Sequence, residues 1–113
     1  MPDANNQTET KSAASAGRQP EAKAATIFAG DYLNRIAGEE IERKARKFLS
    51  EGAEEIIVDF SNTELVNSIG ISILMGVIDA VRDHKADLIF RNVNEHNAEL
   101  FDILGLARHV VIM

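Results

Sequence analysis

The sequence predicts an α/β protein with a mainly parallel central sheet of about four strands and helices packed on it. Two observations predict this fold. After residue 25, short runs rich in β-branched residues alternate with longer segments in which apolar residues recur every three or four positions. Asn or Gly stands at the ends of those longer segments, where helices are commonly capped.

The chain has 113 residues, which is enough for one domain with a single core. Residues 1–25 contain no Val, Ile, Leu, Phe, Tyr or Trp, so we predict a disordered tail or linker there and a folded domain over residues 26–113. The chain has no cysteine and no apolar segment typical of secretion, which favours the cytoplasm. The longest apolar run, residues 69–78, is about half as long as a membrane span, so no membrane insertion is expected.

The first strand is predicted over residues 26–33, with Gly30 as a bulge or a point of close backbone approach. Asn34 is then expected to cap a helix that ends near residue 50, just before Gly52. Apolar residues recur at helical spacing in this segment. Its inner face is expected to carry Ile41, Ala45, Phe48 and Leu49.

The next strand, residues 56–60, is a continuous apolar run and is expected to be a central strand covered on both faces. A loop over residues 61–67 leads to a helix from Ser68 to about Arg82. The remaining elements continue the alternation: a strand at residues 87–91, a helix from the cap Asn94 through Leu104 to Gly105, and a short last strand at residues 110–113.

The formal net charge of −6 lies wholly in residues 26–113, because residues 1–25 hold three acidic and three basic side chains. An acidic folded domain disfavours nucleic acid as a partner, since phosphate binding needs clustered Lys and Arg. The densest basic cluster has acidic residues four positions earlier and is expected to be a solvated helix face. It consists of Arg43, Lys44, Arg46 and Lys47, preceded by Glu39, Glu40 and Glu42.

The helix that begins at Ser68 is apolar over more than half of its circumference, so its surplus apolar surface is either further core or a docking surface. The Ser68 hydroxyl is expected to cap this helix by accepting a hydrogen bond from its first turn. A helix N-terminus also carries a partial positive charge and free N–H groups that suit a phosphate. Capping and modification therefore both remain open for Ser68.

Three short motifs, in this order, carry a family resemblance: Asp59-Phe60-Ser61, Asn67-Ser68-Ile69-Gly70 and Gly105-Leu106. Over residues 26–113 the chain resembles the STAS domain of bacterial anti-sigma factor antagonists. In that family a strand ending in Asp-Leu-Ser leads to an Asp-Ser-Ser-Gly-like motif at a helix start. Two features depart from the family pattern: Asn67 stands where the family commonly has Asp, and the tail shows no match for the short extra strand that usually comes first.

The resemblance implies a binding protein rather than an enzyme. When unphosphorylated, such a protein binds an anti-sigma factor that is also a serine/threonine kinase of the histidine-kinase ATPase fold, and so releases a sigma factor. Phosphorylation of the serine that matches Ser68 breaks the complex, and a PP2C-like phosphatase resets it. ATP would belong to the kinase, so no cofactor is expected. The partner-binding residues implied are Asn67, Ser68, Ile69, Gly70, Ile71, Ser72 and Met75, with Asp59 and Ser61 as structural neighbours.

Other functions stay open at this point. The domain resembles interaction modules of signalling scaffolds and accessory domains of lipid or anion transporters, and a weak nucleotide hydrolase is disfavoured because the chain has no Gly-rich phosphate loop. Ser61 and Thr63 are possible secondary phosphoacceptors or loop caps. Asp59 either serves function at the end of a central strand or orders the loop that follows. The histidines His84, His96 and His109 show no ligand spacing, so no metal site is expected.

Overall fold

The computed structural model describes residues 23–113, so the predicted tail lies outside the described residues except for its last three positions. The first strand begins at Ala24, two residues before the predicted start of the domain. The elements are, in order, β1 (Ala24–Phe28), β2 (Tyr32–Leu33), α2 (Arg35–Ser50), β3 (Glu55–Asp59), β4 (Leu65–Val66), α3 (Ser68–Asp83), β5 (Asp87–Arg91), α4 (Glu95–Ile103), the 3-10 helix η1 (Leu106–Arg108) and β6 (Val111–Ile112).

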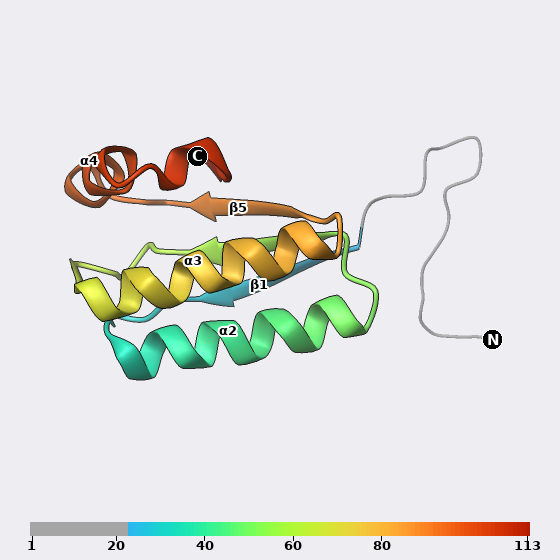
Figure 1. The fold of residues 1–113 in the computed structure, drawn as a ribbon. Coiled ribbons are helices and arrows are strands. Elements are labelled where there is room, and N and C mark those ends of the chain that lie inside the picture. Colours follow the sequence, from blue (N-terminus) through green and yellow to red (C-terminus); the bar gives the residue numbers. More distant parts are fainter. Residues whose placement is uncertain (1–22) are drawn as a thin grey trace.

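The main sheet has four strands in the order β1-β3-β5-β6, and every neighbouring pair is parallel. The helices α2 and α3 lie side by side on this sheet (Figure 1). The predicted α/β class with a parallel central sheet is therefore confirmed. A second, two-stranded sheet joins β2 and β4, which the sequence did not predict.

The helices α2 and α4 begin where the capping residues predict. The Asn34 side chain accepts a hydrogen bond from the Ala37 N–H at 3.0 Å, and Asn94 accepts one from Asn97 at 2.7 Å. The predicted single strand over residues 26–33 is wrong, because the chain turns at Gly30, whose φ is +84°. Glycine adopts this left-handed conformation without steric cost, and β1 and β2 are separate strands as a result.

Only one face of the main sheet is covered by helices within residues 23–113. Right-handed crossovers between strands that are added in one direction place every connecting helix on the same side. On the opposite side, Ile57 and Ile89 are half-buried and Thr26 and Val111 are exposed. The prediction that the strand at residues 56–60 is covered on both faces is therefore wrong for the described chain.

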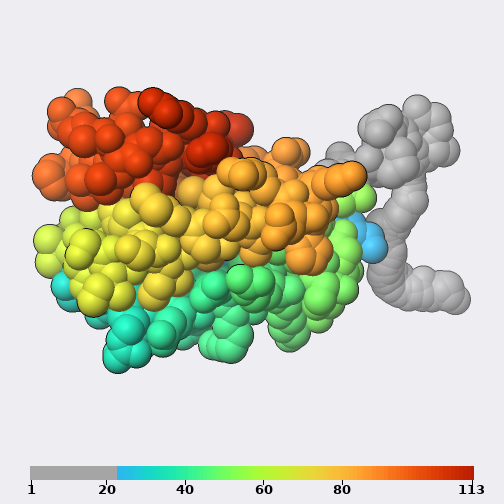
Figure 2. Space-filling view, in the orientation of Figure 1, coloured from blue at the N-terminus to red at the C-terminus, as the bar shows by residue number. Residues whose placement is uncertain are grey.

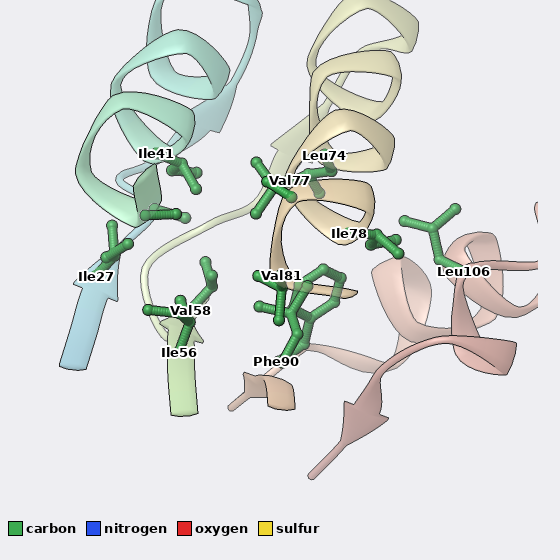
Figure 3. Packing of buried hydrophobic residues seen from close by; sticks show 14 of the residues in the cluster. Ile27, Ile41, Ile56, Val58, Leu74, Val77, Ile78, Val81, Phe90 and Leu106 are labelled. Atoms are coloured by element: carbon green, nitrogen blue, oxygen red, sulfur yellow. The ribbon is translucent and has the colours of Figure 1, made fainter. Parts of the chain in front are cut away.

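The core lies between the covered face and the helices (Figure 3). Ile27, Ile56 and Val58 from the strands meet Ile41 and Leu74 from α2 and α3, and all five are buried. Three aromatic rings extend this core toward α4, with centroids 5.1 to 5.6 Å apart. They belong to Phe60, Phe90 and Phe101.

Candidate functional site

The site is built at the carboxyl end of the sheet, where the loop after β3 leads into α3. Asn67, and not Ser68, caps this helix: the Asn67 Oδ1 accepts a hydrogen bond from the Gly70 N–H at 2.8 Å. The predicted capping role of Ser68 is wrong, because Asn67 has the extended backbone of a cap residue and Ser68 is already the first helical residue. The Ser68 side chain is exposed, and its hydroxyl makes no hydrogen bond within residues 23–113.

The first turn of α3 lies directly against β2. A Cβ atom added to Gly70 would meet the Leu33 carbonyl oxygen at 2.5 Å, which explains why this position has no side chain. The Leu33 oxygen accepts a hydrogen bond from the Asn67 N–H at 2.9 Å. The start of α3 is therefore held in place by backbone contacts, and its exposed side chains are not needed to anchor it.

Of the seven residues predicted to bind a partner, four have exposed side chains. Ile69 is 52% exposed and Met75 is 42% exposed, and Ser68 and Ser72 are also exposed. Ile71, by contrast, is only 5% exposed and belongs to the core. Gly70 is buried and Asn67 is half-buried. Burial removes the Ile71 side chain from any surface that a partner could contact.

Two neighbouring residues extend this exposed surface and were missed from the sequence. Tyr32 and Leu65 are register partners in the β2–β4 pair, and both side chains are exposed. The Asn67 Nδ2 donates a hydrogen bond to the Tyr32 hydroxyl at 3.2 Å, which ties the segments together. The aromatic residue at position 32 was the available signal, but strands of two residues have no periodicity that would have placed it.

The loop that precedes Ser68 is also anchored, through Thr63. Thr63 is 2% exposed, and its hydroxyl donates a hydrogen bond to the Gly30 carbonyl. Its own carbonyl accepts hydrogen bonds from Asn94 and Asn97 at 3.3 and 3.2 Å, which connects the loop to α4. A buried, hydrogen-bonded hydroxyl is inaccessible to a kinase, so the suggestion that Thr63 is a secondary phosphoacceptor is wrong.

Asp59 is 4% exposed and accepts three hydrogen bonds at the end of β3. The Arg91 Nε donates at 2.9 Å, Asn92 donates at 3.1 Å, and the Ser61 N–H donates at 2.8 Å, while the Arg91 Nη2 forms an ion pair with the Asp59 Oδ2 at 2.9 Å. Burial alone would raise the pKa of this carboxyl, but the hydrogen bonds from Ser61, Arg91 and Asn92 outweigh it and hold the pKa below its usual value. Asp59 is thus an ionised group that orders the loop toward Ser68.

The remaining candidate residues do not come together. His84, His96 and His109 lie after α3, in α4 and after η1, respectively. Among residues 23–113 no cluster of three or more His, Cys, Asp or Glu side chains is placed to hold a metal ion. Within the same part of the chain, no helix is both long and apolar enough to cross a membrane.

Together, the fold and the site define a small α/β domain with an exposed serine at a helix start, beside exposed apolar side chains. A model of the STAS domain family matches residues 30–113. The chain belongs to the STAS domain family.

Similar proteins include antagonists and transporter domains. The anti-sigma-B factor antagonist of Staphylococcus epidermidis is 28% identical over 80 residues, which cover 71% of this chain and 74% of that protein. The anti-sigma factor antagonist SpoIIAA in its unphosphorylated form has a similar structure, with a TM-score of 0.65, 18% identity, and coverage of 85% of this chain and 84% of SpoIIAA. The STAS domain of a SulP transporter from Vibrio cholerae gives a TM-score of 0.69 at 17% identity, over 86% of this chain and 79% of that one.

Proposed function

We propose that this protein is an anti-sigma factor antagonist that works as a phosphorylation-controlled binding protein in the cytoplasm. In the unphosphorylated state it binds an anti-sigma factor that is also a serine/threonine kinase of the histidine-kinase ATPase fold, and a sigma factor is released. Phosphorylation of Ser68 breaks this complex, and a PP2C-like phosphatase restores it. The proposal rests on the STAS fold and on the names of the similar proteins.

The observation that carries the proposal is the exposed, unbonded hydroxyl of Ser68 at the first residue of α3. A kinase needs such access, and a phosphate attached there lies beside the backbone N–H groups of Ser68 and Ile69. Neither group has a hydrogen-bond acceptor within residues 23–113. The helix N-terminus thus supports a phosphate without any nearby basic side chain.

The same geometry explains how phosphate would end binding. The exposed side chains of Ile69 and Met75 lie within two turns of Ser68, and Tyr32 lies beside its cap, Asn67. A partner that covers these apolar groups would also cover position 68. A phosphate adds roughly −1.5 to −2 charges there, and the partner would have to strip water from them in order to dock. Binding and modification therefore exclude each other at this surface.

The test begins with a pull-down from native lysate and identifies the kinase recovered with the protein. This kinase and ATP should add one phosphate to the wild type and to Ser72→Ala, but none to Ser68→Ala. Ser72 is the matched control because it is an exposed serine one turn further along the same helix. Ser68→Ala should also remain bound to the kinase in the presence of ATP.

A phosphate that persists in Ser68→Ala, on Ser61 or Ser72, would overturn the site. Recovery of transporter subunits in place of a kinase would favour an accessory role in a transporter. The binding role also predicts that the purified protein hydrolyses neither ATP nor GTP above background. Hydrolysis that is lost in Asp59→Ala would contradict that role.

A further inference from the structure

A groove runs between α3 and the C-terminal segment formed by residues 104–111. It consists of two adjoining hollows of about 270 and 310 Å³, which share Ile78, Arg82 and His109 as lining residues. In Figure 2 the C-terminal segment, in red, borders α3, in yellow and orange, and the groove lies along this border. Ser68, the proposed phosphorylation site, does not line the groove, whereas Met75 of the proposed docking surface does.

The floor and mouth of the groove are apolar. Ile78 and Leu106 are buried at its base, whereas Met75 and Leu104 are both more than two-fifths exposed at its mouth. Exposed apolar side chains that flank a hollow of this kind are typical of surfaces that receive an apolar side chain of a partner. The occupant should therefore present at least one large apolar group.

The arginines of the groove indicate that the occupant carries carboxylates. Six arginines lie within residues 23–113, and four of them have a carboxylate within 4.0 Å: Arg35, Arg43, Arg46 and Arg91. Arg82 and Arg108 have none in that part of the chain, and both line the groove. Arg82 instead contacts the His109 Nδ1 at 3.4 Å. The two guanidinium groups that have no carboxylate partner within residues 23–113 are thus gathered at one surface, where carboxylates of a partner would complement them.

Asp79 and Asp87 also line the groove, one in each hollow. Neither forms an ion pair with a guanidinium group within residues 23–113, so the carboxylates of an occupant can still reach Arg82 and Arg108. Their presence restricts the occupant, because its carboxylates must face the arginines and its apolar or neutral groups must face the aspartates. A uniformly charged ligand fits this arrangement less well than a segment of mixed composition.

The groove is continuous with the surface around Ser68. Ser72, Met75, Asp79 and Arg82 follow Ser68 at intervals of three or four residues, so they lie along one side of α3. Arg82 lies roughly 21 Å from Ser68 along the helix axis at about 1.5 Å per residue. A specific interface covers about 800 Å² on each partner, which the few residues around Ser68 do not supply by themselves.

We propose that the groove binds an acidic and apolar segment of the same partner that docks at Ser68. One apolar side chain of this segment enters the hollow beside Met75 and Leu104, and carboxylates pair with Arg82 and Arg108. The inference rests on the proposed function for the identity of the partner, whereas the chemistry of the segment comes from the groove alone.

The first experiment needs no partner and uses two amidated peptides as probes, Glu-Glu-Leu-Leu-Glu and Lys-Lys-Leu-Leu-Lys. The acidic peptide should shift the NMR amide signals of Arg82, Leu104, Leu106 and Arg108 in the full chain, and the basic peptide should not. Shifts confined to other surfaces, or equal shifts with both peptides, would overturn the proposal. The proposal would also be overturned if the amide signals of the groove residues shifted with protein concentration in the absence of any peptide. Such shifts would identify a second copy of the chain as the occupant.

The second experiment measures the affinity for the kinase by calorimetry. The double variant Arg82→Glu/Arg108→Glu should bind at least tenfold more weakly than the wild type. The control, Arg43→Glu/Arg46→Glu, makes the same change in net charge on the solvated face of α2 and should bind within about twofold of the wild type. All four side chains are largely exposed, so circular dichroism should show both variants folded.

The failures of the two proposals are distinguishable. If the kinase phosphorylates Ser68 but both double variants bind equally well, the groove proposal is wrong and the switch stands. If the acidic peptide binds the groove but no kinase modifies Ser68, the proposed function is wrong and the groove remains a binding site for acidic, apolar segments.

Discussion

The two long helices, α2 and α3, have the same place in the fold and very different outer surfaces. Each has 16 residues, each is capped by an Asn, and each packs on the same face of the sheet. The outer side of α2 carries four ion pairs, between Arg35 and Glu39, Arg43 and Glu40, Lys44 and Glu40, and Arg46 and Glu42. Within the described chain no residue of α3 forms an ion pair, and its outer side exposes Ser68, Ile69, Ser72 and Met75.

This difference distinguishes the solvated outer side of α2 from the proposed docking surface on α3. Exposed ion pairs on a helix contribute little to stability but keep the surface solvated, as on α2. The absence of such pairs on α3 leaves apolar groups and two hydroxyls available to a partner. The anchoring of α3 lies elsewhere, in backbone contacts and in the Asp59 cluster, so its outer residues can serve binding without loss of the fold.

The largest loss of stability is expected when the hydrogen-bonded cluster around Asp59 is changed. This cluster precedes α3 and has no counterpart before α2. Asp59→Asn removes the ion pair with Arg91 and should lower the free energy of unfolding by about 2–3 kcal/mol at pH 7, less than for a fully buried pair because Arg91 is partly exposed. The folded-state pKa of Asp59 is lowered, so its contribution is present above the unfolded value of 3.8 and is lost as the pH falls through the lower folded value. Urea denaturation should therefore show that the wild type and Asp59→Asn differ in their free energy of unfolding, and that this difference narrows below pH 3.8. A constant difference down to pH 2 would contradict this account.

Gly70→Ala should have the next largest effect, because the added Cβ would meet the Leu33 carbonyl oxygen at 2.5 Å and would force α3 away from β2. We expect a net loss of about 2 kcal/mol in thermal or urea denaturation, after the gain in helix propensity. Gly38→Ala in α2 is the matched variant: its Cβ would lie 3.2–3.3 Å from side-chain atoms of Ile73, which is tight but longer than the contact at Gly70 and does not involve backbone among the nearest atoms, so we expect a smaller loss. Equal losses for the two variants would show that backbone contact does not distinguish α3 from α2.

Removal of either Asn cap should cause a smaller loss of stability, of about the same size for both helices. Asn34→Ala and Asn67→Ala each remove one hydrogen bond from a helix start and should each cost about 1 kcal/mol of stability. Only Asn67→Ala also breaks the contact with the Tyr32 hydroxyl, so only this variant should change the rate at which the kinase modifies Ser68. A similar change of rate in Asn34→Ala would mean that helix stability, and not the local geometry at Tyr32, governs the reaction.

The smallest change in stability is expected from Gly76→Ala, at the contact between α2 and α3. A Cβ added to Gly76 of α3 would lie at an ordinary contact distance of 3.5 Å from Glu42 of α2. Gly76→Ala should therefore raise the free energy of unfolding by up to about 1 kcal/mol through helix propensity. A measured loss of stability would show that α2 and α3 are packed more tightly than this distance indicates.

Much of the fold was predictable because its signals are local. The Asn caps, the apolar spacing of α2 and the strand at residues 87–91 each depend on neighbours within one or two turns. The contact between Asp59 and Arg91 depends on the register of β3 with β5, which joins residues 32 positions apart. The strands β2 and β4 are too short to show a periodic pattern. The uncovered face of the main sheet follows from the order of its strands, which local sequence does not reveal. For the site, the serine and its apolar neighbours were predicted, but the capping role of Asn67 and the burial of Ile71 were not.

The parallel sheet gives the domain two unlike poles. β1 starts at Ala24 at the pole remote from Ser68, whereas the Met113 carbonyl, which accepts a hydrogen bond from Asn92, lies at the pole where β3 and β5 end (Figure 1). The proposed docking surface extends from one pole to the other, because Ser68 follows the end of β3, whereas Asp87, which lines the groove, is in register with Glu55 and so with Ala24 at the start of β1. A label attached to the domain at either pole would therefore lie close to only one end of this surface.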